Sequence, residues 1–318
     1  MPEVTPRPVA LAVDVGGTKV EAALVDADGQ VLDRSRHRQP TGRDASSDQL
    51  AAAVVDVAER ALAALPPGAP LLGAGIGSAG PIDDVNGTVS PVNIPAWRGF
   101  ALRDLVRSVV SDQTADQTAD PTVILATDGL AITLAEHWVG AGKGVDNMMG
   151  MVISTGVGGG LILGGRPMHG ASGNAGHIGH IEVSAIDGEP TFGHPDLLEA
   201  VASGPHSVEW ARRHGWKGTT GEELSRDYAL GDEVARAAIT RAGTAVGQAI
   251  SSAAALLDVE LVVIGGGFSQ ATPDLFRIIR ETVASHQLEF VRKVRVLPSS
   301  LSGAGPLIGA AALVHLAH

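Results

Sequence analysis

Leu11-Ala-Val-Asp-Val-Gly-Gly-Thr-Lys19 decides the fold, because it carries an apolar strand directly into a turn with two glycines. The strand runs from Val9 to Val13, and a second apolar run, Val20 to Val25, follows the turn at once. Asp26 to Gly29 has the composition of a hairpin turn, so we expect a third strand from Val31 onward. This opening predicts an α/β domain that starts on three antiparallel strands, unlike the βαβ opening of a dinucleotide-binding domain.

A second strand–turn–strand pattern occurs near the middle of the chain. Met149 to Ser154 is apolar enough for a strand, Thr155 to Gly160 is a glycine-rich turn, and Leu161 to Leu163 is again a strand. This repetition predicts two lobes of the same architecture. A third glycine cluster, Gly265 to Gly267, lies between a buried strand and a helix expected to begin at Pro273. It is either a tight turn that needs positive φ or the start of a ligand-binding helix.

The first glycine turn has the residues of an anion-binding loop. Gly16 and Gly17 let backbone N–H groups approach an anion closely, and Thr18 adds a hydroxyl donor. Asp14, at the end of the strand, can hold Mg²⁺ directly or through water. A hairpin turn capped by the aspartate fits the same residues equally well. Because one such turn opens each half of the chain, we interpret the two turns as loops that hold one phosphate chain from opposite sides.

Asp128 is the candidate catalytic residue. It follows the expected strand Val123 to Ala126 and begins a helix, where an aspartate is common as the N-cap. A carboxylate at such a rigid strand end can also accept the proton of an attacking hydroxyl group in phosphoryl transfer. The sequence alone leaves both interpretations open.

Two familiar motifs fail on their context. Gly75-Ile-Gly-Ser-Ala-Gly80 matches the dinucleotide-binding fingerprint, but Pro81 and turn residues follow it where a helix is required. The sequence contains no G-x-x-x-x-G-K-[ST] motif, which excludes a P-loop enzyme. His177-Ile-Gly-His180 has too few neighbouring ligands to indicate zinc, whereas histidine and glutamate together can bind sugar hydroxyls.

Composition and charge narrow the possible functions. The 318 residues carry a formal net charge of −12, which disfavours nucleic acid because phosphate binding needs clustered Lys and Arg. The longest basic cluster, Arg34 to Arg38, is more typical of a solvated strand end than of a phosphate patch. The absence of cysteine excludes disulfides and thiolate metal sites and fits a reducing cytoplasm. Without a signal-like segment or a run of about 20 apolar residues, we expect a cytoplasmic protein that does not span a membrane.

The remaining segments alternate between expected helices and strands. The polar repeat from Asp112 to Asp120 predicts a surface loop. Expected helices are 47–65, 102–110, 128–141, 233–257, one from 273, and 305–316, and further expected strands are 71–77, 123–126, 261–264 and 294–297.

In this order and through almost the whole chain, these segments resemble the ROK family (repressors, ORFs and sugar kinases) of the actin-like sugar kinase superfamily. Leu11 to Lys19 and Ser154 to Gly160 resemble its two phosphate loops. Gly75 to Pro81 and Val92 to Trp97 resemble its sugar-side segments. The other segments that carry the resemblance are Gly176 to His180, Leu198 to Gly204, Ile264 to Gly267 and Leu307 to Ala311.

The resemblance implies a two-lobed actin-like (ribonuclease H-like) α/β ATPase fold with a cleft between the lobes. One lobe would comprise residues 1–126 and the C-terminal helix 305–318, the other residues 127–304. ATP and Mg²⁺ as cofactors, Asp128 as catalytic base and a homodimer are also implied. The implied sugar contacts are Gly80, Asn93, Thr127, His177, His180 and Glu199. The implied contacts to ATP, with Mg²⁺ near Asp14, are Asp14, Gly16, Gly17, Thr18, Lys19, Thr155, Gly156, Gly158, Gly265, Gly266 and Gly267.

The chain departs from the family pattern at three places. Thr127 stands where the family usually has Asn, and His177 where it usually has Glu, so one sugar contact changes at each position. Losing a buried acceptor can cost about 1–3 kcal/mol with an unchanged ligand. The family's structural zinc uses cysteines, and Pro190, Phe192 and Leu197 occupy their positions here. We therefore expect no zinc, and apolar packing of Phe192 and Leu197 in its place.

The leading hypothesis is an ATP-dependent kinase for a hexose such as glucose, acting on the 6-hydroxyl that the resemblance implies. A kinase for an amino sugar, an N-acetylated hexosamine, a ketose or a non-hexose polyol ranks nearly level, and polyphosphate stays open as the donor. A sugar-responsive repressor is less favoured, because only Met1 to Pro8 precede the first strand. Asp128 and the two glycine turns disfavour a non-catalytic sugar-binding protein.

Overall fold

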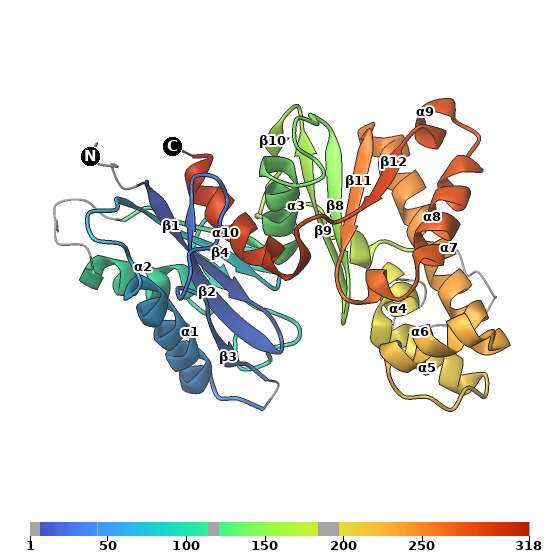
Figure 1. Ribbon diagram of the computed structural model, residues 1–318, viewed down its shortest axis with the longest axis horizontal. Helices are drawn as coiled ribbons and strands as arrows, with labels where there is room; N and C mark the ends of the chain where they lie inside the picture. The colour runs from blue at the N-terminus through green and yellow to red at the C-terminus, as the bar shows by residue number, and fades with distance from the viewer. Residues whose placement is uncertain (1–6, 43, 114–120, 184–196, 318) are drawn as a thin grey trace. The chain divides into compact units, whose positions relative to one another are not determined.

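The computed structural model describes residues 7–42, 44–113, 121–183 and 197–317 (Figure 1). Backbone contacts divide the chain into two compact units. Unit 1 consists of Met1–Lys143, Pro167–Ala175 and Leu301–His318, and unit 2 consists of Gly144–Arg166 and Gly176–Ser300. Unit 1 thus includes the C-terminal helix and continues past residue 126, where the sequence suggested a lobe boundary.

Unit 1 is built on a five-stranded mixed sheet in the order β3-β2-β1-β4-β7. Strands β1, β2 and β3 are antiparallel neighbours, whereas β4 runs parallel to β1 and β7 parallel to β4. Because the carboxyl ends of parallel strands meet at one edge of a sheet, the segments that follow β1, β4 and β7 lie together. The strands are Val9–Val15 (β1), Lys19–Asp26 (β2), His37–Pro40 (β3), Leu71–Ser78 (β4) and Val123–Thr127 (β7).

The second sheet repeats this topology in the order β10-β9-β8-β11-β12. Strands β8 and β9 form the antiparallel hairpin, β11 runs parallel to β8, and β12 parallel to β11. The duplicated architecture that the second glycine-rich segment predicted is therefore confirmed. The strands are Met148–Ile153 (β8), Val157–Leu163 (β9), Arg166–Pro167 (β10), Leu261–Gly265 (β11) and Arg295–Pro298 (β12).

Helices cover both faces of the first sheet (Figure 1). The apolar sides of α1 and α2 pack on the face that carries Leu11 and Leu24. Helix α10 covers the other face, over the small side chains of Ala10 and Ala12. The elements are α1 (Ser47–Leu62), α2 (Leu102–Gln113), α3 (Asp128–Trp138), α10 (Gly305–His315), β5 (Ile82–Asp83), β6 (Thr88–Val89) and η3 (Ser302–Ala304).

Two glycines let the backbone of α10 lie close to its neighbours. A Cβ atom on Gly75 of β4 would lie 1.7 Å from the carbonyl oxygen of Ala310 in α10. A Cβ atom on Gly309 of α10 would lie 1.8 Å from the carbonyl oxygen of Ala131 in α3. No side chain fits at either contact. The C-terminal helix therefore packs directly on β4 and on α3, the helix that begins with the candidate catalytic residue Asp128.

The helices of unit 2 pack around the 25-residue helix α7, whose buried apolar side chains form one core with the second sheet. The sequence did not predict α4 to α6, because they are short and their apolar residues follow no long periodic pattern. None of the described helices combines the length and the apolar composition that crossing a membrane requires. The elements are η1 (Ile178–His180), α4 (Leu198–Ala202), α5 (Gly204–Arg213), α6 (Gly221–Leu230), α7 (Glu233–Leu257), η2 (Phe268–Gln270), α8 (Pro273–Ala284) and α9 (Glu289–Arg292).

The third strand begins later than the sequence suggested. Strand β3 starts at His37, whereas Val31 forms an isolated bridge. Arg34 has a φ of 63°, and the buried hydroxyl of Ser35 accepts a hydrogen bond from the N–H of Leu24 at 3.0 Å. The prediction of a strand from Val31 onward is wrong because this turn interrupts it.

The second glycine turn is shorter than expected. Strand β9 begins at Val157, so three of the glycines lie in the ladder with β8 and outside the turn expected at 155–160. Close packing explains one of these glycines, since a Cβ atom on Gly159 would lie 2.7 Å from the carbonyl oxygen of Gly150. The turn itself consists of residues 154–156.

Candidate active site

Asp14 and Asp128 lie beside the same glycine at the carboxyl edge of the first sheet. Asp14 pairs with Gly77 of β4. A Cβ atom on Gly77 would lie 3.9 Å from Oδ1 of Asp14 and 3.8 Å from Cα of Asp128. Burial, and then the negative charge of Asp128, raise the pKa of the Asp14 carboxyl to about 7. The two acidic side chains therefore form a site where a cation is favoured.

The donor set at this edge fits a magnesium ion. Mg²⁺ takes oxygen ligands, commonly one or two carboxylates together with water and substrate phosphates. Asp14 and Asp128 supply carboxylates, and no group of three or more His, Cys, Asp or Glu side chains suited to a metal occurs in the described ranges. An ion here would therefore be shared with the phosphates of a substrate. Asp14 as its ligand stays a prediction.

Thr127 is the N-cap of α3, so the N-cap interpretation of Asp128 is wrong. The hydroxyl of Thr127 accepts a hydrogen bond from the N–H of Leu130 at 3.3 Å, and the residue is 2% exposed. Asp128 is the first residue of the helix, and its Oδ1 accepts from the N–H of Gly129 at 2.7 Å. The Asp128 side chain thus lies at the start of α3, directly after the carboxyl end of β7, and its role as general base stays a prediction.

A buried glutamate that the sequence analysis did not single out supports the first glycine turn. Glu21 of β2 is 1% exposed and pairs with Asp14 in the β1–β2 ladder. Its carboxylate accepts hydrogen bonds from Lys19, from Arg36 at 3.1 Å and from Arg38 at 2.8 Å. Although burial acts to raise it, these cations leave the pKa of Glu21 below its ordinary value. Lys19 is therefore fixed directly after the turn.

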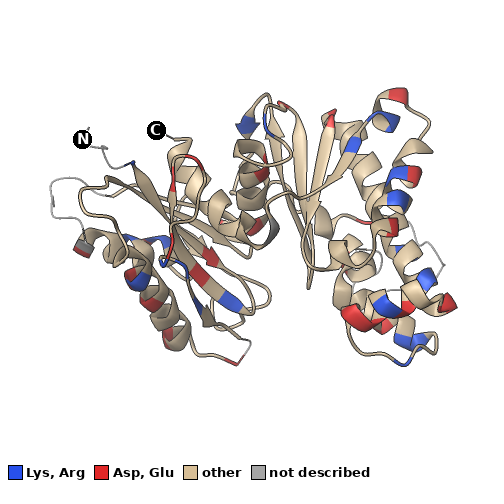
Figure 2. Ribbon diagram, viewed as in Figure 1, with Lys and Arg blue, Asp and Glu red and all other residues tan. Residues whose placement is uncertain are grey.

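Figure 2 shows charged residues on β2, which carries Lys19, Glu21 and Asp26. Strands β4, β7, β8, β9 and β11 contain no charged residue. The interpretation of the cluster Arg34 to Arg38 as a solvated strand end is incomplete, because Arg36 and Arg38 both bind Glu21. A lone glutamate inside the apolar run Val20 to Val25 was the signal that could have revealed this cluster.

Two of the predicted sugar contacts lie in one segment of unit 1. A Cβ atom on Gly17 would lie 2.3 Å from Nδ2 of Asn93, so the Asn93 amide rests on the first glycine turn. The carbonyl oxygen of Gly80 accepts a hydrogen bond at 3.3 Å from the N–H of Val92, the residue before Asn93. The fold thus brings Gly80 and Asn93 next to the turn that was predicted to bind phosphate.

Glu199, a predicted sugar contact in unit 2, touches the second glycine turn. Its Oε2 accepts a hydrogen bond from the N–H of Val157 at 2.8 Å. A Cβ atom on Gly156 would lie 2.6 Å from the same oxygen. His177 and His180 lie at the two ends of the single turn η1, and their ring centroids are 5.8 Å apart. The contact of Glu199 with the glycine turn is a feature that sequence reasoning missed.

A pocket of about 910 Å³ opens beside this turn. Ser154 and Thr155 of the turn and Gly267 of the third glycine cluster line it. Gly266 has a φ of 98°, and a Cβ atom on it would lie 2.4 Å from the carbonyl oxygen of Ile153. Glycine is therefore required where the two glycine-rich segments meet. Further lining residues come from α5, from α6 and the segment just before it, and from η2, among them Arg212, Thr219, Glu222, Phe268 and Gln270.

Comparison with known proteins identifies one family, whose sequence model spans nearly the whole chain. The sequence model of the ROK family matches residues 10–317. The chain belongs to the ROK family. A glucokinase from Thermotoga maritima is 29% identical over 97% of this chain and 98% of its own length. An N-acetylmannosamine kinase from Yersinia pseudotuberculosis is 33% identical over 95% and 96%. The crystal structure of a ROK family glucokinase from Streptomyces griseus, with glucose and AMPPNP, has a TM-score of 0.79 at 28% identity and covers 97% of this chain and 99% of that one.

The family model and the similar crystal structure confirm the ROK family and the actin-like fold that the sequence predicted. The relatives also bear out the kinase class, since glucokinases and N-acetylmannosamine kinases both match at about 30% identity. The individual contact residues, from Asp14 to Gly267, stay predictions.

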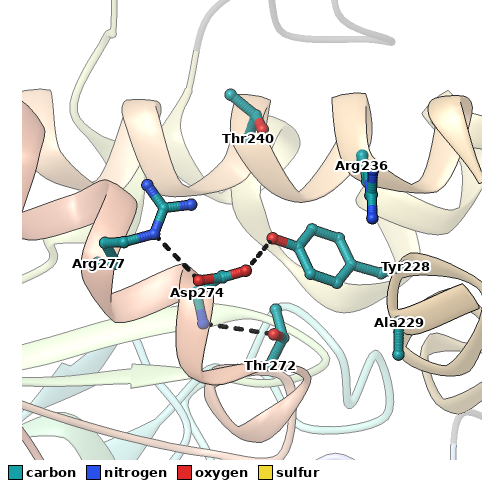
Figure 3. A pocket seen from close by; sticks show the side chains of 7 residues that line it. All are labelled: Tyr228, Ala229, Arg236, Thr240, Thr272, Asp274 and Arg277. Carbon is teal, nitrogen blue, oxygen red and sulfur yellow. Dashed lines mark hydrogen bonds and ion pairs between the residues drawn. The ribbon is translucent and has the colours of Figure 1, made fainter. Parts of the chain in front are cut away.

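A second polar pocket of this ROK protein, of about 590 Å³, lies between α6, α7 and α8 (Figure 3). The hydroxyl of Tyr228 donates to Oδ2 of Asp274 at 2.6 Å, and Nε of Arg277 donates to Oδ1 of Asp274 at 3.0 Å. The bond from Tyr228 fastens α6 to α8, whereas the bond from Arg277 lies within α8 and orients the Asp274 carboxylate (Figure 3). Because Glu222 and Ser225 of α6 line the 910 Å³ pocket, the network also holds one wall of that pocket in place.

Part of the segment to which the family resemblance assigned a zinc site lies outside the described residues. Pro190 and Phe192 fall there, as does the polar repeat from residue 114 onward. Leu197 is described and forms an isolated bridge with Glu182 just before α4. The packing of Phe192 against Leu197 stays a prediction.

Proposed function

We propose that this ROK protein is an ATP-dependent kinase that phosphorylates a hydroxyl group of a sugar. The 910 Å³ pocket carries the proposal, because Thr155 and Gly267 from two separate glycine-rich segments line it together. Glycine turns leave backbone N–H groups accessible to phosphate oxygens, and the rest of the pocket offers room for a nucleoside. AMPPNP in the Streptomyces griseus relative supports ATP as the donor.

On the acceptor side, Asp128 is the proposed general base. Its carboxylate takes the proton of the sugar hydroxyl while that oxygen bonds to the γ-phosphorus and the bond from phosphorus to ADP breaks. Lys19, held by Glu21, is suited to balance negative charge on the phosphoryl group. A magnesium ion near Asp14 would neutralise further phosphate charge when bound.

The proposed acceptor is a hexose such as glucose, with an N-acetylated hexosamine as the second candidate. The N-acetylmannosamine kinase at 33% identity supports the second candidate. At Thr127 the hydroxyl already accepts from Leu130 and keeps one O–H to donate to a sugar oxygen, so this contact differs from the usual family contact for either candidate. The asparagine usual in the family offers two N–H donors and a carbonyl acceptor at this position.

A coupled ADP-release assay with ATP and Mg²⁺ tests the proposal across a sugar panel. The panel contains glucose, mannose, fructose, allose, glucosamine, N-acetylglucosamine and N-acetylmannosamine. We expect turnover that depends on one sugar or on a few related ones, and the selected sugar distinguishes the two candidates. Folded protein that releases no ADP with any sugar would contradict a kinase for these acceptors.

The carboxyl group of Asp14 should make the stability of the metal-free protein fall with rising pH. Its pKa is raised from 3.8 to about 7 in the folded protein. Between these values the unfolded chain has lost the proton that the folded chain keeps, so folding becomes less favourable as pH rises. Between pH 5 and pH 8 the unmodified protein should therefore lose about 2–3 kcal/mol of unfolding free energy relative to Asp14→Asn, which has no carboxyl group at this position.

Urea unfolding in the presence of EDTA measures this difference at both pH values. Asp33→Asn removes the carboxyl group of an exposed aspartate in the same unit and serves as the matched control. A pH-independent difference for Asp14→Asn would mean that Asp14 keeps its ordinary pKa.

A further inference from the structure

Two hydrogen bonds from the α4–α5 segment hold the second glycine turn in unit 2. Oε2 of Glu199, on α4, accepts from the N–H of Val157 at 2.8 Å. The N–H of Gly204, at the start of α5, donates to the carbonyl oxygen of Ser154 at 2.9 Å. Within the turn, the N–H of Ser154 donates to the carbonyl oxygen of Gly156 at 2.9 Å. Both ends of the turn are thus held by residues more than 40 positions away in sequence.

The glycine at position 156 leaves room for the same carboxylate in its present position. A Cβ atom on Gly156 would lie 2.6 Å from Oε2 of Glu199, well inside van der Waals contact. By contrast, a Cβ atom on the neighbouring Gly158 would meet nothing within 4 Å. Gly156 and Glu199 therefore form a matched pair, in which the missing side chain makes room for the carboxylate oxygen.

We propose that Glu199 is the positioning residue of the second glycine turn and thereby sets the affinity for the phosphate donor, in addition to any contact with the sugar. The consequence for the donor rests on the proposed function, because Ser154 and Thr155 of this turn line the candidate nucleotide pocket. A hydrogen bond to a carboxylate is about twice as strong as one between neutral groups, so this contact can hold the turn before any ligand binds. A residue that touched only the sugar would leave donor binding unchanged when no sugar is present.

Truncating Glu199 should weaken donor binding in the absence of sugar. Removing one hydrogen bond to a charged group corresponds to about 10- to 100-fold in affinity. We therefore expect Glu199→Ala to raise the Kd for ADP with Mg²⁺ by that factor, measured by calorimetry without sugar. Glu199→Gln keeps an oxygen that can accept from Val157 and should restore most of the affinity. Glu260→Gln changes an exposed glutamate of the same unit and should have no effect.

A double-mutant cycle shows whether the effect passes through the glycine turn. Gly156→Ala alone should weaken ADP binding about as much as Glu199→Ala, because its methyl group displaces the carboxylate. In the Glu199→Ala background the same glycine substitution should cost less than about twofold, because the clash partner is gone. Equal effects of Gly156→Ala in both backgrounds would overturn the proposal.

Hydrogen-exchange mass spectrometry of residues 153–160, without sugar or nucleotide, tests the positioning itself. Glu199→Ala should speed the exchange of this segment, and Glu260→Gln should not. If the unmodified protein fails to bind ADP, the proposed function falls, while the exchange measurement still decides whether Glu199 holds the turn. Unchanged exchange and unchanged ADP affinity in Glu199→Ala, with only the KM for sugar raised, would reduce Glu199 to a sugar contact.

Discussion

Replacing Asp128 by Asn should lower sugar-dependent ADP release by about 10²- to 10⁴-fold, the range that a general base contributes. The amide has nearly the same shape, so Thr127 still caps α3 and the fold should be retained. An amide does not take up the proton of the sugar hydroxyl at neutral pH, however, and the attacking oxygen stays a weak nucleophile. The effect should therefore appear in kcat, with little change in the Kd for the sugar that the panel selects.

Asp48→Asn is the matched control for this variant. Asp48 is an exposed aspartate in the first turn of another helix, α1, so its substitution removes a similar charge from a similar place. We expect its kcat to equal that of the unmodified protein. Turnover in Asp128→Asn within about threefold of normal, with an unchanged Tm, would show that another group accepts the proton.

Replacing Gly75 by Ala should destabilise unit 1 by at least about 3 kcal/mol, at the upper end of what overpacking costs. The new Cβ atom would lie 1.7 Å from the carbonyl oxygen of Ala310, and both atoms belong to backbone. No side-chain rotation relieves such a clash, so α10 has to move away from β4. Because α10 also packs on α3, the movement reaches the helix that begins with Asp128.

Thermal unfolding followed by circular dichroism measures this loss as a fall in Tm of about 6–12 °C. Gly42→Ala is the matched control, because a Cβ atom there meets nothing within 4 Å and should leave the Tm unchanged. A Tm for Gly75→Ala within about 2 °C of the control would contradict the close packing of α10 on β4.

The contact between Gly75 and Ala310 explains the first glycine of the segment Gly75 to Gly80, which matches a dinucleotide-binding fingerprint in sequence only. Gly75, Gly77 and Gly80 match a dinucleotide-binding fingerprint, yet none of them begins a phosphate-binding helix. Gly75 makes room for α10, Gly77 lies between Asp14 and Asp128, and Gly80 accepts a hydrogen bond from Val92. The spacing of the three glycines matches the fingerprint, although each glycine contacts a different neighbouring segment.

Elements with long local patterns were predictable from the sequence. Helix α7 was expected from Glu233 to Leu257, and the structure has the same bounds. The strands around the first glycine turn were placed to within two residues. Backbone hydrogen bonds between near neighbours and one apolar face determine these elements, and both leave a periodic trace in the sequence. The order of the motifs along the chain also indicated the ROK family, which the family model confirms.

Only the tertiary structure decided which distant residues meet at the candidate site. The pairing of β1 with β2 places Glu21 beside Asp14, and the folding of α4 onto the second turn brings Glu199 to Val157, 42 residues away. The raised pKa of Asp14 likewise depends on burial and on a neighbour more than 100 positions along the chain. The sequence by itself determined the strands around the first glycine turn, helix α7 and the family, because these follow from local order. Register and packing between remote segments set the hydrogen bonds and charges of the site, and no local pattern records them.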